Sequence, residues 1–173
     1  AENLKNFKAG VVFVIDSTIS MQPYIDSTKK AMQKIYNEIE KNNLQDKVKF
    51  GLVAFRSDIK VNPELEYITR MYVNPNQSDK NFLVNLKNLQ AATVSSQKFD
   101  EDSYAGIYHA LNEINWKEFG GRYIILITDA GAINANDERS STGLGAEEIR
   151  LEAQRLGVAI YTLHLQTPAG KNN

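Results

Sequence analysis

Two continuous apolar runs stand out in the hydrophobic pattern of the chain. Residues 10–15 read GVVFVI and residues 122–128 read RYIILIT, and each run leads directly into an aspartate. Runs of this kind are typical of strands that are buried on both faces of a parallel sheet. Residues 48–55 (VKFGLVAF) and 158–165 predict two further strands, and the alternating residues 67–73 (YITRMYV) predict an edge strand.

Helical periodicity separates these predicted strands. Apolar side chains recur every three or four positions over residues 20–42, which predicts an amphipathic helix with Ser20 as its N-cap. Residues 82–89, 104–114 and 146–156 predict three more helices. Strands that alternate with helices indicate an α/β fold with a doubly wound, mainly parallel sheet flanked by helices.

The length of the chain predicts a single domain. With 173 residues, it fits one domain that extends from residue 1 to residue 173. The sequence stops soon after the last predicted strand. We therefore expect this domain to be a fragment of a longer protein, and we expect its last helix and strand to be missing.

Composition narrows the possible partners. The chain is 42% hydrophobic and 24% charged, close to an average soluble globular protein. Its formal net charge of −1 disfavours nucleic acid and anionic membrane surfaces as partners. No apolar run approaches the roughly 20 residues that a membrane-spanning helix needs. The chain has no cysteine, which excludes disulfides and thiolate chemistry.

The polar residues that follow the two apolar runs suggest a shared site. Asp16 follows the first run, Asp129 follows the second, and Thr18 and Ser20 lie on the loop that leaves the first strand. Ligands of open parallel sheets bind at the carboxyl ends of the strands. An extended loop points alternate side chains the same way, so Asp16, Thr18 and Ser20 can converge. Such oxygen donors suit Mg²⁺, Mn²⁺ or Ca²⁺, whereas zinc fits poorly without thiolates or a nearby histidine.

A further set of oxygen donors precedes the helix predicted at residues 104–114. Residues 99–103 read Phe-Asp-Glu-Asp-Ser, and they supply Asp100, Glu101 and Asp102. Acidic residues at this position are equally explained as favourable partners of the helix dipole. Both interpretations therefore stay open for each of these three acids.

Two of these segments resemble a known family. Residues 16–20, Asp-Ser-Thr-Ile-Ser, resemble the Asp-x-Ser-x-Ser metal-binding loop of von Willebrand factor type A domains, with Thr18 in place of the middle serine. Residues 127–131, Ile-Thr-Asp-Ala-Gly, resemble the later Thr-Asp-Gly loop of that family. The resemblance spans residues 10 to about 165 in the same element order. It implies a Rossmann-like fold, a metal ion-dependent adhesion site (MIDAS) that includes Asp16, Thr18, Ser20 and Asp129, and a protein partner.

The middle loop departs from the family pattern. Integrin-like members place a threonine ligand there, whereas residues 98–107 read KFDEDSYAGI and contain no threonine. Alignment to the threonine-bearing members implies Glu101, and bacterial members with a Gly-Asp-x-Pro-Glu loop imply Asp100 or Asp102 instead. The resemblance thus adds Glu101 and Asp102 to the expected metal ligands and leaves the choice among the three acids open. A carboxylate there would favour cation binding without an acidic group from a partner.

A narrower resemblance concerns two segments. Residues 11–26 (VVFVIDSTISMQPYID) and 163–171 (LHLQTPAGK) resemble the type A domain at the end of bacterial serine/threonine kinases associated with type VI secretion. This likeness implies a sensor domain outside the cytoplasmic membrane, in the periplasm. Without it, the cytoplasm is the expected location.

Three classes of function are compatible with such a fold, and the first turn separates them. We favour a non-catalytic, metal-dependent protein-interaction module. A magnesium-dependent hydrolase or phosphoryl-transfer domain is the alternative, but it would need an Asp-x-Asp loop, and residues 16–18 are Asp-Ser-Thr. A nucleotide-binding domain would need a glycine-rich first turn, and residues 16–20 contain no glycine.

Overall fold

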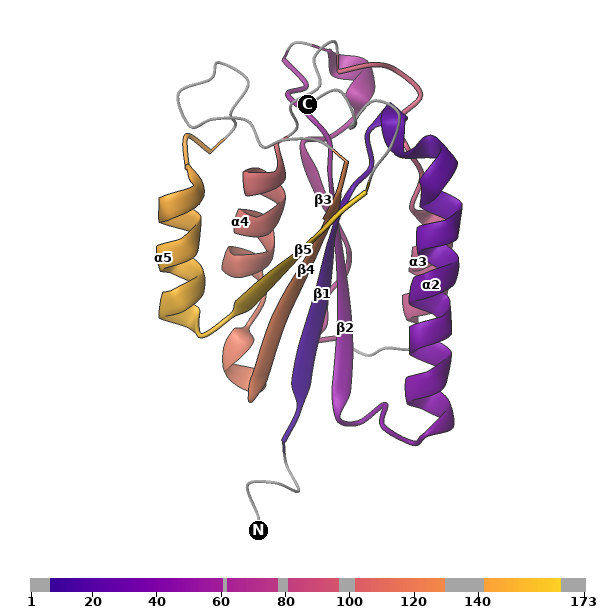
Figure 1. The fold of residues 1–173 in the computed structure, drawn as a ribbon, viewed down its shortest axis with the longest axis vertical. Helices are drawn as coiled ribbons and strands as arrows, with labels where there is room; N and C mark the ends of the chain where they lie inside the picture. Colours follow the sequence, from indigo (N-terminus) through magenta and orange to yellow (C-terminus); the bar gives the residue numbers. More distant parts are fainter. Residues whose placement is uncertain (1–6, 61, 78–80, 97–101, 130–141, 166–173) are drawn as a thin grey trace.

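The computed structural model describes residues 7–60, 62–77, 81–96, 102–129 and 142–165. A five-stranded sheet of order β3-β2-β1-β4-β5 forms its centre, and helices cover both faces (Figure 1). The strands are β1 (Ala9–Asp16), β2 (Val48–Phe55), β3 (Thr69–Val73), β4 (Gly121–Thr128) and β5 (Ala159–His164). The α-helices are α2 (Gln22–Lys41), α3 (Phe82–Asn88), α4 (Ser103–Glu113) and α5 (Ala146–Leu156). The short 3₁₀ turns among the described residues are η1 (Ile19–Met21), η2 (Pro63–Leu65) and η4 (Trp116–Glu118).

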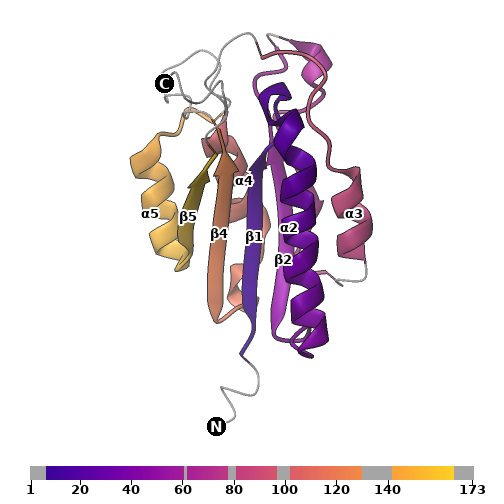
Figure 2. The ribbon, with the colours of Figure 1, turned by 45° about the vertical axis from the view of Figure 1, so that its right-hand side comes forward.

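The sheet confirms the predicted doubly wound α/β fold. Strand β1 is parallel to β2 and β4, and β4 is parallel to β5, whereas β3 pairs antiparallel with β2 at the edge. Helices α2 and α3 lie on one face, and α4 and α5 lie on the other (Figure 2). Because β1 pairs in register with both neighbours up to Ile15, the carboxyl ends of three parallel strands lie at the same edge of the sheet.

Each face of the sheet has its own hydrophobic core. Side chains of a strand alternate between the two faces, so Val12 and Val14 of β1 pack toward α4 and α5 while Phe13 and Ile15 pack toward α2 and α3. Helix α4 lies very close to the sheet at Gly106. A Cβ atom at this position would lie 2.8 Å from the Phe55 ring and 2.9 Å from a methyl group of Val14. This close approach fixes the start of α4 at the carboxyl edge.

Most predicted elements are confirmed, and one predicted cap is wrong. The bounds of β2 and α5 match the prediction, and β3 is the predicted edge strand, two residues shorter than expected. Ser20 does not cap the long helix, because it lies within η1 and α2 begins at Gln22 after Met21. The Ser20 hydroxyl instead donates a hydrogen bond to Asp129. Its role is therefore tertiary rather than local.

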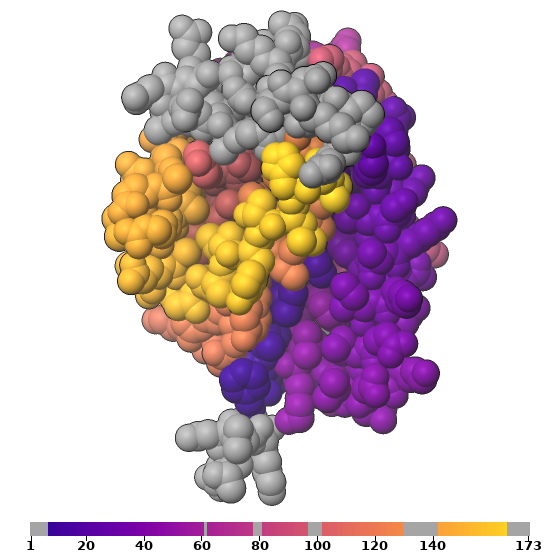
Figure 3. All heavy atoms as spheres, viewed as in Figure 1, coloured from indigo at the N-terminus to yellow at the C-terminus, as the bar shows by residue number. Residues whose placement is uncertain are grey.

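Strand β5 differs from the other parallel strands in its exposure. It pairs with β4 only, and among the described residues no helix follows it. Tyr161 and Leu163 are 58% and 55% exposed. The space-filling view shows β5 at the surface between α5 and α2 (Figure 3). None of the helices in the described part of the chain is long and apolar enough to cross a membrane.

Candidate metal centre

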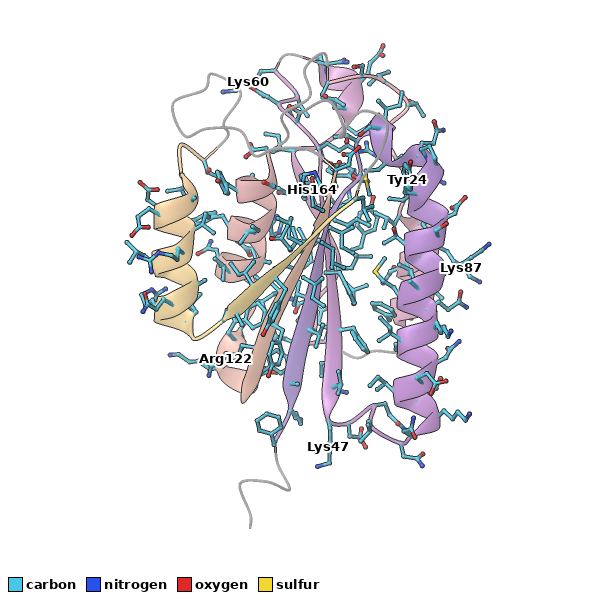
Figure 4. The ribbon with its side chains drawn as sticks, in the orientation of Figure 1. Tyr24, Lys47, Lys60, Lys87, Arg122 and His164 are labelled. Atoms are coloured by element: carbon cyan, nitrogen blue, oxygen red, sulfur yellow. The ribbon has the colours of Figure 1, made fainter. Side chains whose placement is uncertain are left out.

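Two aspartates lie buried side by side at the carboxyl edge of the sheet. Asp16 is the last residue of β1, and Asp129 directly follows β4, the parallel neighbour of β1. Both residues are 0% exposed. Lys60 marks this edge and Lys47 marks the opposite one (Figure 4). The prediction that the two strand ends meet is therefore confirmed.

Hydrogen bonds join these carboxylates to the hydroxyls of the loop after β1. The Asp16 Oδ1 atom accepts bonds from the Thr18 main-chain N–H at 2.9 Å and from the Thr18 hydroxyl at 2.5 Å. The Ser20 hydroxyl donates to Asp129 Oδ1 at 3.2 Å and lies 3.3 Å from Thr18 Oγ1. We call these four side chains, Asp16, Thr18, Ser20 and Asp129, the oxygen cluster. It joins residues that are 109 positions apart in the sequence.

The local fold of the loop explains why its hydroxyls converge. Thr18 is extended, with φ −71° and ψ 167°, and its carbonyl accepts a bond from the Met21 N–H at 3.0 Å. This bond closes the η1 turn and brings Ser20 back toward the sheet. The Met21 side chain is fully buried and anchors the turn in the core. An extended residue followed by a tight, anchored turn therefore positions both hydroxyls.

Burial of two carboxylates together has an electrostatic consequence. The pKa of Asp16 is raised from its ordinary value of 3.8 to about 7, mainly by burial and also by the nearby charge of Asp129. Hydrogen bonds from Thr18 act in the opposite direction and partly offset this rise in the pKa of Asp16. A cation bound between the two aspartates would relieve both the repulsion and the loss of hydration.

Asp102, one of the predicted ligands, lies at the start of α4. It is 1% exposed and is the N-cap of α4, where its Oδ1 atom accepts a bond from the Ala105 N–H at 3.2 Å. Within the described ranges, no three His, Asp or Glu side chains form a group that could hold a metal ion, so the acidic part of the site consists of Asp16 and Asp129 there. The bond to Ala105 agrees with the helix-partner interpretation of Asp102, and its role as a metal ligand stays a prediction. Glu101 and Asp100 lie outside the described residues.

The donors that do gather fit a hard divalent cation. They are two carboxylates and two hydroxyls, the oxygen ligands that Mg²⁺, Mn²⁺ and Ca²⁺ prefer. Neither histidine contributes to the cluster: His164 is exposed on β5, and His109 on α4 lies 2.8 Å from the Thr69 hydroxyl through its Nδ1 atom. Because four donors leave coordination positions open, water or a group from a partner would complete the shell.

Sequence reasoning missed several residues around the cluster. Thr128 donates a bond from its hydroxyl to Asp16 Oδ2 at 3.2 Å. Its place directly before Asp129 could have identified it. Ser17 and Arg56 are also buried next to the cluster, with exposures of 0% for Ser17 and 4% for Arg56. No local pattern marks these two residues, because their contacts join distant segments.

Comparisons with known proteins agree with this architecture. The family model described as von Willebrand factor type A domain matches residues 10–172. No curated protein matches the sequence.

The similar solved structures include three of proximal thread matrix protein 1 from the mussel byssus. One is a second crystal form (16% identity, TM-score 0.57, 90% of this chain and 35% of that chain covered). Another has 15% identity and a TM-score of 0.59 with the same coverage. A third, described as having a zinc-occupied MIDAS motif, has 16% identity and a TM-score of 0.59, and the match covers 91% of this chain. This chain spans 35% of the length of these relatives, and the likeness establishes the fold.

Proposed function

Since the chain belongs to the von Willebrand factor type A domain family, we propose that it is a metal-dependent protein-interaction module of the sensor or adhesion type. Domains of this family are generally non-catalytic interaction modules. The observation that carries the proposal is the hydrogen bond from Ser20 to Asp129, which joins the loops after β1 and β4 at 3.2 Å. The motifs at residues 16–20 and 127–131 are each weak evidence for a metal site, and this bond joins them into one oxygen cluster.

The four residues of the oxygen cluster are the proposed protein ligands, some of them acting through water. Asp16 and Asp129 supply charge, and the Thr18 and Ser20 hydroxyls supply neutral oxygens. One acid among residues 100–102 is proposed to complete the set, and Glu101 is the first choice because Asp102 already caps α4. Mg²⁺ is the proposed ion, with Mn²⁺ or Ca²⁺ as substitutes. The ion would offset the two buried carboxylates and offer a position to an oxygen atom of a partner protein.

Zinc has to be included when this proposal is tested. The zinc-occupied MIDAS motif belongs to the mussel protein, which is 16% identical to this chain. It supports the idea that a related fold binds a divalent ion at a site of this kind. The donor set of this chain contains only oxygen atoms, which favours harder ions than zinc.

We further propose that residues 1–173 are one domain of a longer bacterial protein. The support is the likeness of residues 11–26 and 163–171 to the type A domain of kinases associated with type VI secretion. In such a protein the domain would sense a partner outside the cytoplasmic membrane, and any catalytic activity would belong to the kinase.

Calorimetric titration of the metal-free protein with Mg²⁺, Mn²⁺, Ca²⁺ and Zn²⁺ tests the metal site. We expect saturable binding of one ion per chain in the wild type and no measurable binding in Asp16→Asn. Asp58→Asn is the matched control, because Asp58 is also buried shortly after a strand but accepts a local bond from the Lys60 N–H at 2.8 Å. Wild-type protein that binds no ion at millimolar concentrations, or Asp16→Asn protein that binds as the wild type does, would contradict the proposal.

A further inference from the structure

A buried arginine lies directly behind the loop of the oxygen cluster. Arg56 follows the last residue of β2, and only 4% of its surface is exposed. A guanidinium group stays charged at every physiological pH, and its burial is unfavourable unless its donors are bonded. The proposed metal ligands do not explain why Arg56 is buried at this position.

The guanidinium of Arg56 joins three segments of the chain. Its Nε atom donates to the Ser17 hydroxyl at 3.3 Å, its Nη1 atom to the Leu65 carbonyl at 2.8 Å, and its Nη2 atom to the Gln90 carbonyl at 3.0 Å. The one carboxylate that pairs with it in the described part of the chain belongs to Glu66, at 3.7 Å, and that side chain is 63% exposed. An ion pair of this length whose carboxylate is exposed to solvent contributes little stability. The planar fork of Arg56 thus holds three segments mainly through neutral oxygens.

A tyrosine completes this arrangement. The guanidinium of Arg56 stacks over the Tyr67 ring at 4.2 Å from its centroid. The Tyr67 hydroxyl lies 2.9 Å from Ser17 Oγ and 3.2 Å from the hydroxyl of Tyr72. Burial raises the pKa of Tyr67, so this hydroxyl stays protonated. Arg56 and Tyr67 therefore both fix the side chain of Ser17, the residue between Asp16 and Thr18 of the oxygen cluster.

Main-chain bonds tie the same residues to further loops. The Ser17 N–H donates to the Phe55 carbonyl at 3.0 Å, and the Ser17 carbonyl accepts from the Ala92 N–H at 2.8 Å. The Arg56 carbonyl accepts from the Asp102 N–H at 3.2 Å, so Arg56 also contacts the start of α4. A shift of Ser17 cannot occur without a change in at least one of these bonds.

We propose that Arg56 is a positioning residue that couples the oxygen cluster to the segments at residues 62–67 and 89–92. Because it fixes Ser17, it sets the spacing of Asp16 and Thr18 and thereby the affinity for the cation. The same bonds transmit a change at the cluster to Leu65 and Gln90. Coupling of this kind is reciprocal, so a protein bound at either segment would change the affinity for the ion. This inference rests on the proposed metal-binding function.

Two substitutions test the role of Arg56, and a third is their control. Arg56→Lys keeps the charge but loses the fork that reaches three acceptors. Ser17→Ala removes the hydroxyl that Arg56 and Tyr67 share, and it leaves the arginine in place if Arg56→Lys fails to fold. Arg70→Lys is the control, because Arg70 stacks over the same Tyr67 ring at 4.3 Å but is exposed.

The first readout is the affinity for Mn²⁺ by calorimetry. Residues that support metal ligands from outside the shell typically change affinity by about 10–100-fold. We expect Arg56→Lys and Ser17→Ala to weaken binding by roughly tenfold or more, and Arg70→Lys to bind as the wild type does. Wild-type affinity in both test variants would overturn the role of Arg56 and leave the metal site intact. A wild type that binds no ion would instead contradict the proposed function, and this inference with it.

The second readout is hydrogen exchange, which separates coupling from simple stability. In the wild type, metal-free and Mg²⁺-loaded protein should differ in exchange at the Ala92 and Tyr67 amides, which lie outside the cluster. In Arg56→Lys, the effect of the metal on exchange at Ala92 and Tyr67 should disappear. The core amide of Val14 should stay as protected from exchange as it is in the wild type. Faster exchange at Ala92 with unchanged metal affinity would show a structural role alone and would overturn the proposal.

Discussion

Asp16 and Asp102 are both buried aspartates that precede a helical turn, but their carboxylates make different bonds. Asp102 accepts a main-chain N–H from the first turn of α4. Asp16 accepts bonds from the hydroxyls of Thr18 and Thr128, and the second aspartate, Asp129, lies beside it. One carboxylate is therefore satisfied by its own helix, and the other belongs to an assembly of several segments.

The difference shows what distinguishes a capping acid from a candidate ligand. A helix N-terminus offers N–H donors and a favourable dipole, so a cap stabilises the fold in the absence of any ion. Two carboxylates that converge at a sheet edge repel each other and lose hydration, as the raised pKa of Asp16 indicates. Such a pair destabilises the metal-free fold, and a cation that offsets it gains affinity.

The largest expected effect on stability comes from Gly106→Ala, which disturbs the capped helix and not the oxygen cluster. The new Cβ would lie 2.8 Å from the Phe55 ring, and overpacking of this kind costs about 1–3 kcal/mol. We expect a lower free energy of unfolding in urea, with α4 displaced from the sheet. Cation affinity measured under native conditions should change little. A loss of affinity as large as that of Asp16→Asn would remove the distinction between the two regions.

The next largest effect is on the free energy of unfolding, which substitution of Asp102 and substitution of Asp16 should change in opposite directions. Asp102→Ala removes a cap and should lower the free energy of unfolding by about 1 kcal/mol. Asp16→Ala should raise it in the metal-free protein above pH 7, because one of two repelling carboxylates is gone. Urea denaturation of both variants in a chelator measures this pair of changes. If both variants lose stability by the same amount, Asp16 acts as a structural residue as Asp102 does.

The sequence predicts the features that depend on neighbouring residues or on regular sheet geometry better than those that depend on contacts between distant segments. The apolar strands, the amphipathic helices and the convergence of Asp16 with Asp129 follow from periodicity and from the geometry of parallel sheets. The capping role of Asp102 was one of two open interpretations, because an acid before a helix looks the same in either case. The cap predicted at Ser20 is wrong because cap rules are local, whereas its hydrogen-bond partner Asp129 directly follows the distant strand β4. Arg56 was missed because its acceptors come from three distant segments.

The pH dependence of the free energy of unfolding should show a smaller effect, which comes from Asp16. The pKa of Asp16 is about 7 in the folded protein and 3.8 ordinarily, so the folded state binds the proton more tightly. The resulting contribution to stability is fully present below pH 3.8 and is lost as the pH rises through about 7. We expect the difference in unfolding free energy between wild type and Asp16→Asn to change across this range in the metal-free protein.

Cation affinity should follow the opposite trend. Because the ion binds the ionised carboxylate, binding releases a proton below pH 7, and affinity should rise by up to about tenfold per pH unit there. Titrations in buffers of different ionisation enthalpy measure the released protons. A cation affinity that is independent of pH between 5.5 and 7 would be incompatible with Asp16 as a ligand, directly or through water.

The smallest expected effect comes from Thr128→Val. This change removes the hydroxyl that donates to Asp16 Oδ2 at 3.2 Å, and it keeps the shape of the side chain. We expect the pKa of Asp16 to rise further and cation affinity to fall by several-fold, in line with a lost supporting bond. Thr69→Val is the matched control, because the Thr69 hydroxyl bonds to His109 away from the cluster. Equal affinities of the two variants would mean that Thr128 plays no part in the site.

Paramagnetic broadening by Mn²⁺ tests most directly whether β1 and β4 build one cation site. Substoichiometric Mn²⁺ is added to isotope-labelled protein, and amide signals are followed by NMR. We expect the signals of Thr18, Ser20 and Thr128 to broaden together and excess Mg²⁺ to restore them. Broadening confined to an exposed acidic surface such as Glu147 and Glu148 on α5, or broadening of one strand end without the other, would contradict a shared site.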